Sequence, residues 1–159
     1  VRIMPNVMAS NTKSQTYIYM KNKKLFDNKL RKILLTFGTI IFAKNEDQIN
    51  FATSVFGSGP AFIAYIVNIF IKASKKLAKP YNMNEKDVIE LFKNVLDTNN
   101  SSKLLDSFVS SISSKKGTTH AGINYIKSQK MEKIIYTTLY RAYKRAKEID
   151  SDKKNTNSW

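Results

Sequence analysis

The sequence contains no cysteine, so disulfide bonds and thiolate metal sites are excluded. Its single histidine, His120, leaves no basis for a zinc site built from several histidines or for a Ser-His-Asp triad elsewhere. A lone histidine one step into an expected helix is typical of a surface or capping residue. We therefore expect no metal site and assign no catalytic residue. Because no secretory signal pattern opens the chain, we expect a reduced, cytoplasmic protein.

Acidic residues are scarce. The chain carries 12 Asp and Glu against 27 Lys and Arg, for a net charge of +15. Such a balance favours binding to nucleic acid or to an acidic membrane surface. Only 4 of the 27 cations are arginine, the residue that binds phosphates bidentately. Abundant Lys, Asn and Ile are typical of an AT-rich gene, so we interpret the charge mainly as a solvated basic surface. A polyanion-binding module remains the alternative, since tyrosines interleave with the cations of the last helix.

Charged residues are also missing from residues 49–71, a stretch long enough to cross a bilayer. The Gly57-Ser58-Gly59-Pro60 turn should break this stretch, and the unbroken apolar part, residues 61–71, is too short to span. We expect no membrane segment. A helix that is apolar on all sides must be buried on all sides, and a second copy of the chain would supply the cover.

The first 44 residues have the pattern of mixed α/β structure. Residues 1–4, 16–20 and 39–43 are rich in β-branched and aromatic side chains and are expected to form short strands. Residues 25–37 have helical spacing, with Gly38 as the expected C-cap. This strand–helix–strand alternation is typical of a doubly wound sheet, but it is too short to close one.

From Asn45 onward the chain is expected to be helical, which makes the fold mainly α. Asn84 is expected to cap one helix, with Asp87 as its capping partner. The other expected helices cover residues 46–54, 60–77, 104–112, 123–130 and 131–149. The polar residues 150–159 are expected to be a disordered tail.

Three short motifs suggest binding rather than structure alone. Gly117-Thr118-Thr119 opens a helix, where free backbone N–H groups can hold an anion such as a carboxylate. The second motif, Gly57-Ser58-Gly59-Pro60, is by itself a helix start. The third, Met4-Pro5-Asn6, is by itself a turn. Taken singly, each motif has this ordinary structural interpretation.

In this order the three motifs resemble the C-terminal part of pyrroline-5-carboxylate reductase, over about residues 1–149. The resemblance implies a helical dimerisation domain of the 6-phosphogluconate-dehydrogenase-like C-terminal type in residues 45–149. Residues 1–44 would be the trailing edge of a Rossmann-type nucleotide-binding domain. The implied reaction is NADPH- or NADH-dependent reduction of 1-pyrroline-5-carboxylate to L-proline, by a homodimer or larger homo-oligomer.

The resemblance also assigns the residues of the site. Gly117, Thr118 and Thr119 would hold the substrate carboxylate, with Ser58 near the substrate. The residues near the nicotinamide would be Met4, Pro5, Asn6 and Gly57. No base is required, because the imine can carry its own proton.

The chain departs from the family pattern at several of these positions. Lys115-Lys116 stands where the family has Pro-Gly, and Phe56 and Phe62 replace a serine and a tyrosine. A ring at position 56 is expected to crowd the pocket. No Gly-x-Gly-x-x-Gly phosphate turn is present, so the main nucleotide-binding half is missing from these 159 residues. Three interpretations stay open: part of a working two-part enzyme, a decayed remnant, or a non-catalytic helical dimerisation scaffold.

Overall fold

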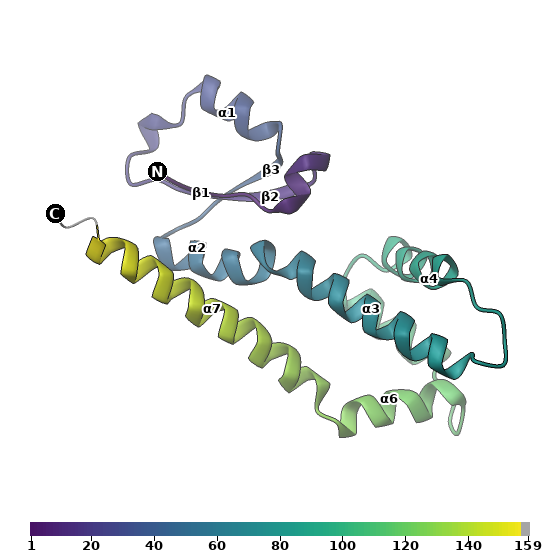
Figure 1. Ribbon diagram of the computed structural model, residues 1–159. Coiled ribbons are helices and arrows are strands. Elements are labelled where there is room, and N and C mark those ends of the chain that lie inside the picture. The colour runs from purple at the N-terminus through teal and green to yellow at the C-terminus, as the bar shows by residue number, and fades with distance from the viewer. Residues whose placement is uncertain (157–159) are drawn as a thin grey trace. The chain divides into compact units, whose positions relative to one another are not determined.

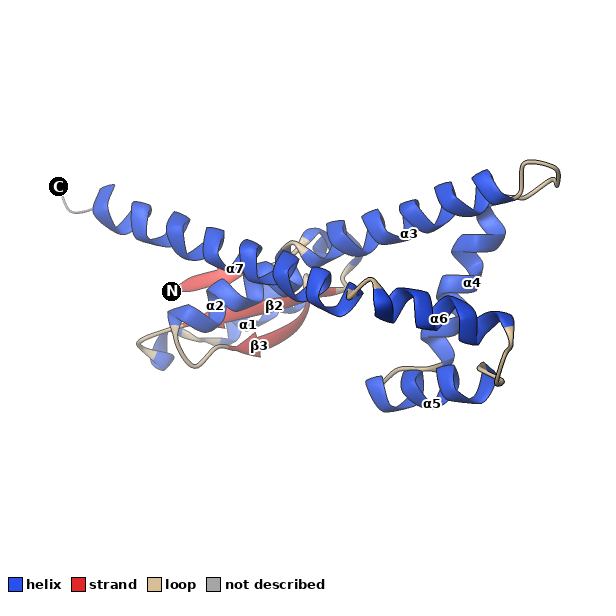
Figure 2. Ribbon diagram, turned by 90° about the horizontal axis from the view of Figure 1, so that it is seen from below, coloured by secondary structure: helices blue, strands red, loops and turns tan. Residues whose placement is uncertain are grey.

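The computed structural model describes residues 1–156, with side chains to residue 152. Helices dominate, and a small three-stranded sheet lies near the N-terminus (Figure 1 and Figure 2). The chain divides into two compact units, residues 1–62 with 135–159 (unit 1) and residues 63–134 (unit 2). The expected domain boundary at residue 44 stays a prediction. Unit 1 contains the strands, the helix that follows the sheet, and the C-terminal part of the last helix.

The sheet of unit 1 contains β1 (Arg2–Met4), β2 (Ser14–Tyr19) and β3 (Gly38–Phe42), in that spatial order. Strand β1 is antiparallel to β2, and Met4 lies opposite Tyr17. Strand β3 is parallel to β2, and Phe42 lies opposite Ile18. The three strands expected from the sequence are thus confirmed.

Two helices cover opposite faces of this sheet, as Figure 1 shows: α1 (Asn28–Leu35) and α2 (Glu46–Ala52). Successive side chains of a strand point to opposite faces. Ile18 therefore packs with Leu34 of α1, whereas Tyr17 packs with Ile49 of α2. From Thr16 to Ile18 both faces of β2 are buried, which fits the Thr-Tyr-Ile sequence of that part of the strand.

Helix α1 is shorter than the sequence indicates. The Asp27 side chain accepts a hydrogen bond from Leu30 N–H and caps its start, and a 3₁₀ turn (Lys23–Leu25) precedes it. The helix ends at Leu35 with Thr36 as its cap, so the expected role of Gly38 as C-cap is wrong. Gly38 instead begins β3 with φ +133°, and a Cβ there would collide with the Ser14 carbonyl.

Helix α2 continues almost unbroken into α3 (Gly59–Leu77), contrary to the break expected at Gly57-Ser58-Gly59-Pro60. A π-helical turn, η3 (Thr53–Gly57), joins the two helices, and Ser58 alone lies outside helical structure. The Ser58 N–H donates to the Thr53 carbonyl at 2.9 Å, five residues back. The widened turn thus carries the helix across the glycines instead of ending it.

The run from Glu46 to Leu77 is long and apolar enough to cross a membrane by length and composition alone. The core helix of a soluble protein passes the same test. Here only 17% of the most apolar window is buried within the chain. Ile63 and Tyr65 of α3 are 62% and 67% exposed. The single chain therefore does not supply the cover that the sequence requires, and burial against a second copy stays a prediction.

Unit 2 contains most of α3, followed by α4 (Glu85–Thr98), α5 (Ser102–Ile112) and α6 (Thr118–Ser128). Asn84 caps α4 as expected, and Ser101 caps α5. Helix α6 begins at Thr118, several residues before the start at Ile123 expected from apolar spacing.

The last helix, α7 (Met131–Thr156), begins in unit 2 and ends in unit 1. It runs past Ile149, so the first residues of the expected disordered tail are helical. The remainder of that tail, residues 157–159, lies outside the described residues.

Candidate functional site

The predicted site residues fall into two groups, one in each compact unit. Met4, Pro5, Asn6, Gly57 and Ser58 belong to unit 1, whereas Gly117–Thr119 belong to unit 2. Each group has its own local geometry.

In unit 1, the end of β1 meets the π-helical turn. A Cβ built on Gly57 would lie 3.5 Å from the Met4 sulfur and 3.7 Å from a Thr53 methyl carbon, so the turn packs directly on the end of β1. Met4 also contacts the buried cluster of Tyr17, Ile49 and Ala52. The structure thus brings together two of the segments that the sequence places fifty residues apart. Pro5, the next residue, is exposed beside them.

Asn6 fixes the conformation of this corner and is only 9% exposed. Its N–H donates to the Ser14 hydroxyl at 3.0 Å, and its side-chain oxygen accepts from Met8 N–H at 2.9 Å. Its side-chain nitrogen donates to the Gln15 side chain at 3.4 Å. Because these groups are engaged within the chain, Asn6 shapes the corner and is not a free hydrogen-bonding arm.

Two buried hydroxyls support Asn6 from beneath, and the sequence analysis missed them. Ser14 and Thr16 are both 0% exposed, and their oxygens lie 3.1 Å apart. Buried polar groups require hydrogen-bond partners, and here Asn6 N–H and the hydroxyl pair provide them. The sequence carries only a weak signal for this pair, since Ser14 and Thr16 occupy alternate positions of β2 but Gln15 between them is also polar.

The π-helical turn also determines where Phe56 lies. Its ring packs on that of Tyr17 with the centroids 5.0 Å apart, so it joins the core on the α2 face of the sheet. The expectation that this ring would crowd a ligand pocket gains no support from the contact. Ser58 follows as the bend residue, and its carbonyl accepts from Ala61 and Phe62 N–H at the start of α3. Single π turns inside α-helices are frequent at functional sites.

In unit 2, Gly117 is the N-cap of α6, and no side chain caps this helix. The first backbone N–H groups of an α-helix have no intrahelical acceptor and carry the positive end of the helix dipole. The helix therefore offers Thr118 and Thr119 N–H groups and hydroxyls to an anion. A Cβ on Gly117 would lie 2.5 Å from the Ser114 hydroxyl and 3.1 Å from its carbonyl. A side chain at this position would therefore displace the Ser114 side chain and press on its carbonyl.

The lysine pair before Gly117 takes an unusual backbone conformation. Lys116 has φ +64°, the left-handed region that favours glycine. Lys116, at the position where the resemblance expects glycine, thus has a backbone conformation that favours glycine. Nearby, the Ser113 hydroxyl oxygen is buried and has no hydrogen-bond partner among the described residues.

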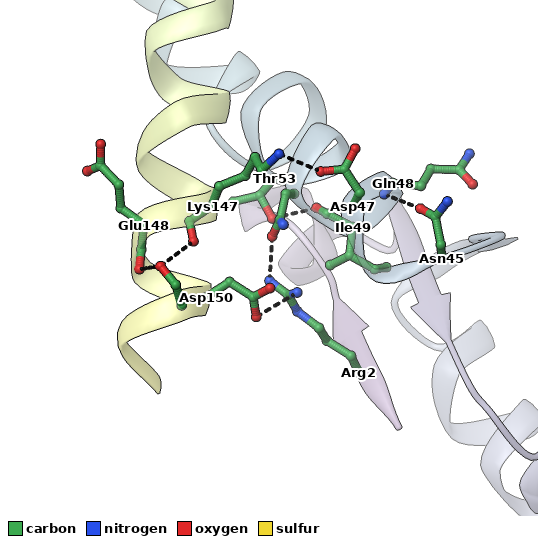
Figure 3. A network of polar contacts seen from close by, with 11 residues as sticks. Arg2, Asn45, Asp47, Gln48, Ile49, Thr53, Lys147, Glu148 and Asp150 are labelled. Carbon is green, nitrogen blue, oxygen red and sulfur yellow. Dashed lines mark hydrogen bonds and ion pairs between the residues drawn. The ribbon is translucent and has the colours of Figure 1, made fainter. Parts of the chain in front are cut away.

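A polar cluster, which the sequence also did not indicate, joins α7 to α2 and β1 within unit 1 (Figure 3). The Tyr143 hydroxyl donates to the Asp47 carboxylate at 2.7 Å, and the Lys147 ammonium lies 3.4 Å from the same carboxylate. Arg2 bridges Asn50 at 2.8 Å and Asp150 at 3.0 Å. We name these six residues the α7 clamp.

Hydrogen bonding within the α7 clamp shifts three ionisations. The bond from Tyr143 lowers the pKa of the Asp47 carboxyl, with a further contribution from the Lys147 charge. The same bond raises the pKa of Tyr143. Contact with Tyr143 and the Asp47 charge raises the pKa of Lys147.

Comparison with known proteins gives a consistent result. Residues 46–149 match the family described as pyrroline-5-carboxylate reductase dimerisation. Pyrroline-5-carboxylate reductase of Staphylococcus haemolyticus is 28% identical over 157 residues, covering 97% of this chain and 58% of that protein. The enzyme of the same name from Staphylococcus aureus is 29% identical over 161 residues, covering 94% of this chain and 56% of that protein.

Solved structures share the fold. A Coxiella burnetii pyrroline-5-carboxylate reductase aligns with a TM-score of 0.70 at 26% identity, covering 92% of this chain and 56% of that one. A Plasmodium falciparum pyrroline carboxylate reductase, solved with NADP bound, aligns with a TM-score of 0.76 at 18% identity and the same coverage. The chain thus spans little more than half the length of these relatives.

Proposed function

This chain belongs to the pyrroline-5-carboxylate reductase family, and we propose that it is the substrate-binding and dimer-forming part of an enzyme that reduces 1-pyrroline-5-carboxylate to L-proline. The observation that carries this proposal is the start of α6. Gly117 leaves that helix without a side-chain cap, and a Cβ there would crowd Ser114. An uncapped helix start with two threonines suits the carboxylate of a small cyclic imine.

Gly117, Thr118 and Thr119 hold the carboxylate in this proposal. Their N–H groups and hydroxyls fix the substrate by one end, which orients the imine carbon. The exposed ammonium groups of Lys115 and Lys116 attract an anionic substrate to this turn. We also propose Ser58, at the bend before α3, as a substrate-binding residue.

The residues present fit one end of a nicotinamide cofactor. Met4 and Gly57 form a packed apolar corner, Pro5 is exposed beside it, and Asn6 holds the corner rigid. No glycine-rich phosphate turn occurs in the sequence, so the remainder of an NADPH or NADH site must come from protein outside these residues. When bound, the reduced nicotinamide supplies a hydride. The chain's residues place the imine and exclude water from it, and the proton on the imine nitrogen arrives with the substrate.

The apolar surface of α3 supports a homodimer. Side chains of this helix that stand at least 48% exposed in the single chain include Ile63, Tyr65, Ile69 and Phe70. Exposed apolar patches of this kind mark protein or membrane contacts. We favour a second copy over a bilayer because the matched family is described by its dimerisation. A dimer of this type also fits a cytoplasmic protein.

A complementation assay tests the proposed activity. The 159-residue chain is mixed with the separately expressed nucleotide-binding half of the Staphylococcus aureus relative, and NADPH oxidation is followed after addition of 1-pyrroline-5-carboxylate. We expect no turnover by either part alone and substrate-dependent oxidation by the mixture. Thr119→Val, which removes one hydroxyl at the start of α6, is expected to raise KM about tenfold or more with a smaller change in kcat.

Binding of L-proline to the chain alone separates the alternatives. A scaffold without a substrate site would dimerise and show no proline-dependent NMR shifts at Gly117–Thr119, and that result would refute the proposal. A polyanion-binding module would instead bind nucleic acid with an affinity that falls steeply with salt. The tyrosines of α7 are the observation that favours this alternative. The ring centroids of Tyr136 and Tyr140 lie 6.0 Å apart, and the Lys144 ammonium lies 5.8 Å from the Tyr140 ring centroid.

A further inference from the structure

Strand β3 leaves one edge of the sheet unpaired among the described residues, since β2 pairs with it on one side only. Ser14 N–H donates to the Phe37 carbonyl, and Ala43 N–H donates to the Ile18 carbonyl. Backbone direction alternates along a strand, so residues 39 and 41 also face β2. The N–H and C=O groups of Gly38, Ile40 and Phe42 therefore face outward along the free edge.

Two devices that often protect an edge strand, charged residues and proline, are missing from β3. Its sequence, Gly-Thr-Ile-Ile-Phe, contains no charge and no proline. Phe42 is 52% exposed, and its ring meets that of Phe26 edge-on at 4.9 Å. A short apolar strand with open backbone groups is suited to pairing with another extended segment.

A groove runs beside this edge. It has a volume of about 650 Å³ and lies between β3 and α1, where Phe26, Leu35, Ile40 and Phe42 give it apolar walls. Leu35 is 50% exposed. The volume is in the range of ligand-binding clefts. Side chains on alternate positions of a strand added to β3 would point into this groove.

The rim of the groove is basic. Arg31 lines it, and its guanidinium makes no hydrogen bond or ion pair that would compete for a ligand among the described residues. The segment leading into and through α1 carries further exposed cations, which are Lys21, Lys23, Lys24, Lys29 and Lys32. The one carboxylate in residues 21–37, Asp27, is committed to Leu30 N–H as the helix cap.

We propose that the free edge of β3 and the groove beside it bind an extended acidic peptide segment by strand addition. The backbone of the segment pairs with the outward-facing groups of residues 38, 40 and 42. Its alternate apolar side chains enter the groove, and a carboxylate meets Arg31. The charge of the rim selects an acidic partner and opposes edge-to-edge pairing of two copies of this chain, which would bring the same six cations together.

Selection from a random dodecapeptide library displayed on phage tests the proposal on the full 159-residue chain. We expect enrichment of sequences that alternate apolar residues with Asp or Glu. In amide hydrogen exchange, the synthesised peptide should protect residues 38, 40 and 42. Ile40→Pro removes one outward N–H without touching the β2 ladder and should weaken peptide binding about tenfold or more.

Two matched controls keep the test sharp. Ile40→Ala loses the same side chain but keeps the N–H, so it should retain more binding than Ile40→Pro. Arg31→Glu should abolish selection of acidic sequences, whereas Lys29→Glu, the same charge change on a residue that does not line the groove, should have a small effect. Far-UV circular dichroism verifies that each variant folds.

Three outcomes would overturn the proposal. The first is selection of no peptide above the level found with Ile40→Pro. The second is selection of basic or helical sequences. The third is peptide protection elsewhere, with the β3 amides unchanged. A dimer that forms through β3 and is lost in Ile40→Pro would assign the edge to a second copy and would refute the acidic-peptide assignment.

Discussion

At the scale of single residues, Gly117 and Gly122 give a matched comparison. Both are glycines at or in α6, but a Cβ at Gly117 would crowd Ser114, whereas a Cβ at Gly122 has nothing within 4 Å. Gly117→Ala should therefore destabilise the chain by about 1–2 kcal/mol. Gly122→Ala, in the helix interior, should stabilise it by up to about 1 kcal/mol. Urea unfolding midpoints with unchanged m-values check both.

Ligand binding separates the two substitutions further. Gly117→Ala should weaken L-proline binding, because the helix start shifts away from Ser114 and its N–H groups lose their alignment. Gly122→Ala should leave that binding unchanged. Equal binding by both variants would show that the start of α6 is not where the carboxylate is held.

Lys116 is a non-glycine residue in a backbone conformation that favours glycine. A left-handed backbone conformation costs a non-glycine residue about 1 kcal/mol or more. The turn before α6 nevertheless keeps this conformation, because the Gly117 N–H still donates to the Ser114 carbonyl at 2.9 Å. The exchange of glycine for lysine at this place is therefore tolerated by the backbone, at a cost to stability.

At the scale of secondary-structure elements, the α7 clamp makes the attachment of α7 dependent on pH. The Asp47 pKa lies below its ordinary value of 3.8 in the folded chain. A lowered carboxyl pKa contributes stability above pH 3.8 that is lost as the pH falls through the folded-state pKa. Tyr143 and Lys147 have raised pKa values, so their contribution is lost at the other end, above pH 10.

Asp47→Asn should accordingly lower the urea midpoint at neutral pH, and the difference from the unsubstituted chain should shrink towards zero in acid. Tyr143→Phe, which keeps the ring and loses the hydroxyl, should also lower the urea midpoint at neutral pH. The effect is small and is reduced by salt, since the clamp is at the surface. Asp97→Asn is the control, since that exposed carboxylate of α4 has no place in the clamp. A difference between wild type and Asp47→Asn that persists in acid would rule out this electrostatic account.

Several elements can be predicted from the local sequence. For the elements that cannot, the cause is physical. The strands of residues 2–4 and 38–42 and the cap at Asn84 were predictable because β-branched runs and capping side chains act locally. The π turn at residues 53–57 was not, because it involves tertiary contacts of Phe56 with Tyr17 and of Gly57 with Met4. The extension of α7 past Ile149 involves Arg2, which is distant in sequence and reaches Asp150.

The candidate site was predictable only as separate pieces. Gly117 and Gly57 were found by their turn chemistry and by resemblance. The Ser14–Thr16 support beneath Asn6 and the Asp47–Tyr143 contact were not, since each depends on tertiary neighbours. A sequence pattern identifies a residue that needs a special backbone conformation more readily than one that only supplies a partner.

At the scale of the whole molecule, the exposed face of α3 determines how the chain behaves in solution. Burying one large apolar side chain contributes about 1.5–3 kcal/mol, so losing one contact should weaken a dimer about tenfold or more. Ile63→Glu should therefore move the monomer–dimer equilibrium toward monomer. Light scattering coupled to size-exclusion chromatography, over a range of protein concentrations, measures this shift.

Lys76→Gln is the matched control, since it also lowers the net charge by one unit and lies on the same helix. It should leave the dimer unaffected. Partition of the unsubstituted chain into neutral lipid vesicles instead of dimer formation would overturn the dimer assignment and support a membrane-embedded α3.

The division into units has a consequence for synthesis of the chain. Unit 1 is built from residues 1–62 and from residues after 134, and Arg2 and Asp150 are an ion pair across nearly the whole sequence. On a ribosome, the residues of the sheet are translated before α7, so Asp47 and Arg2 meet their α7 partners only after residues 143–150 have been made. During that delay the α2 face is incompletely covered, so the nascent chain should be most open to chaperones and proteases until residues 143–150 have left the exit tunnel.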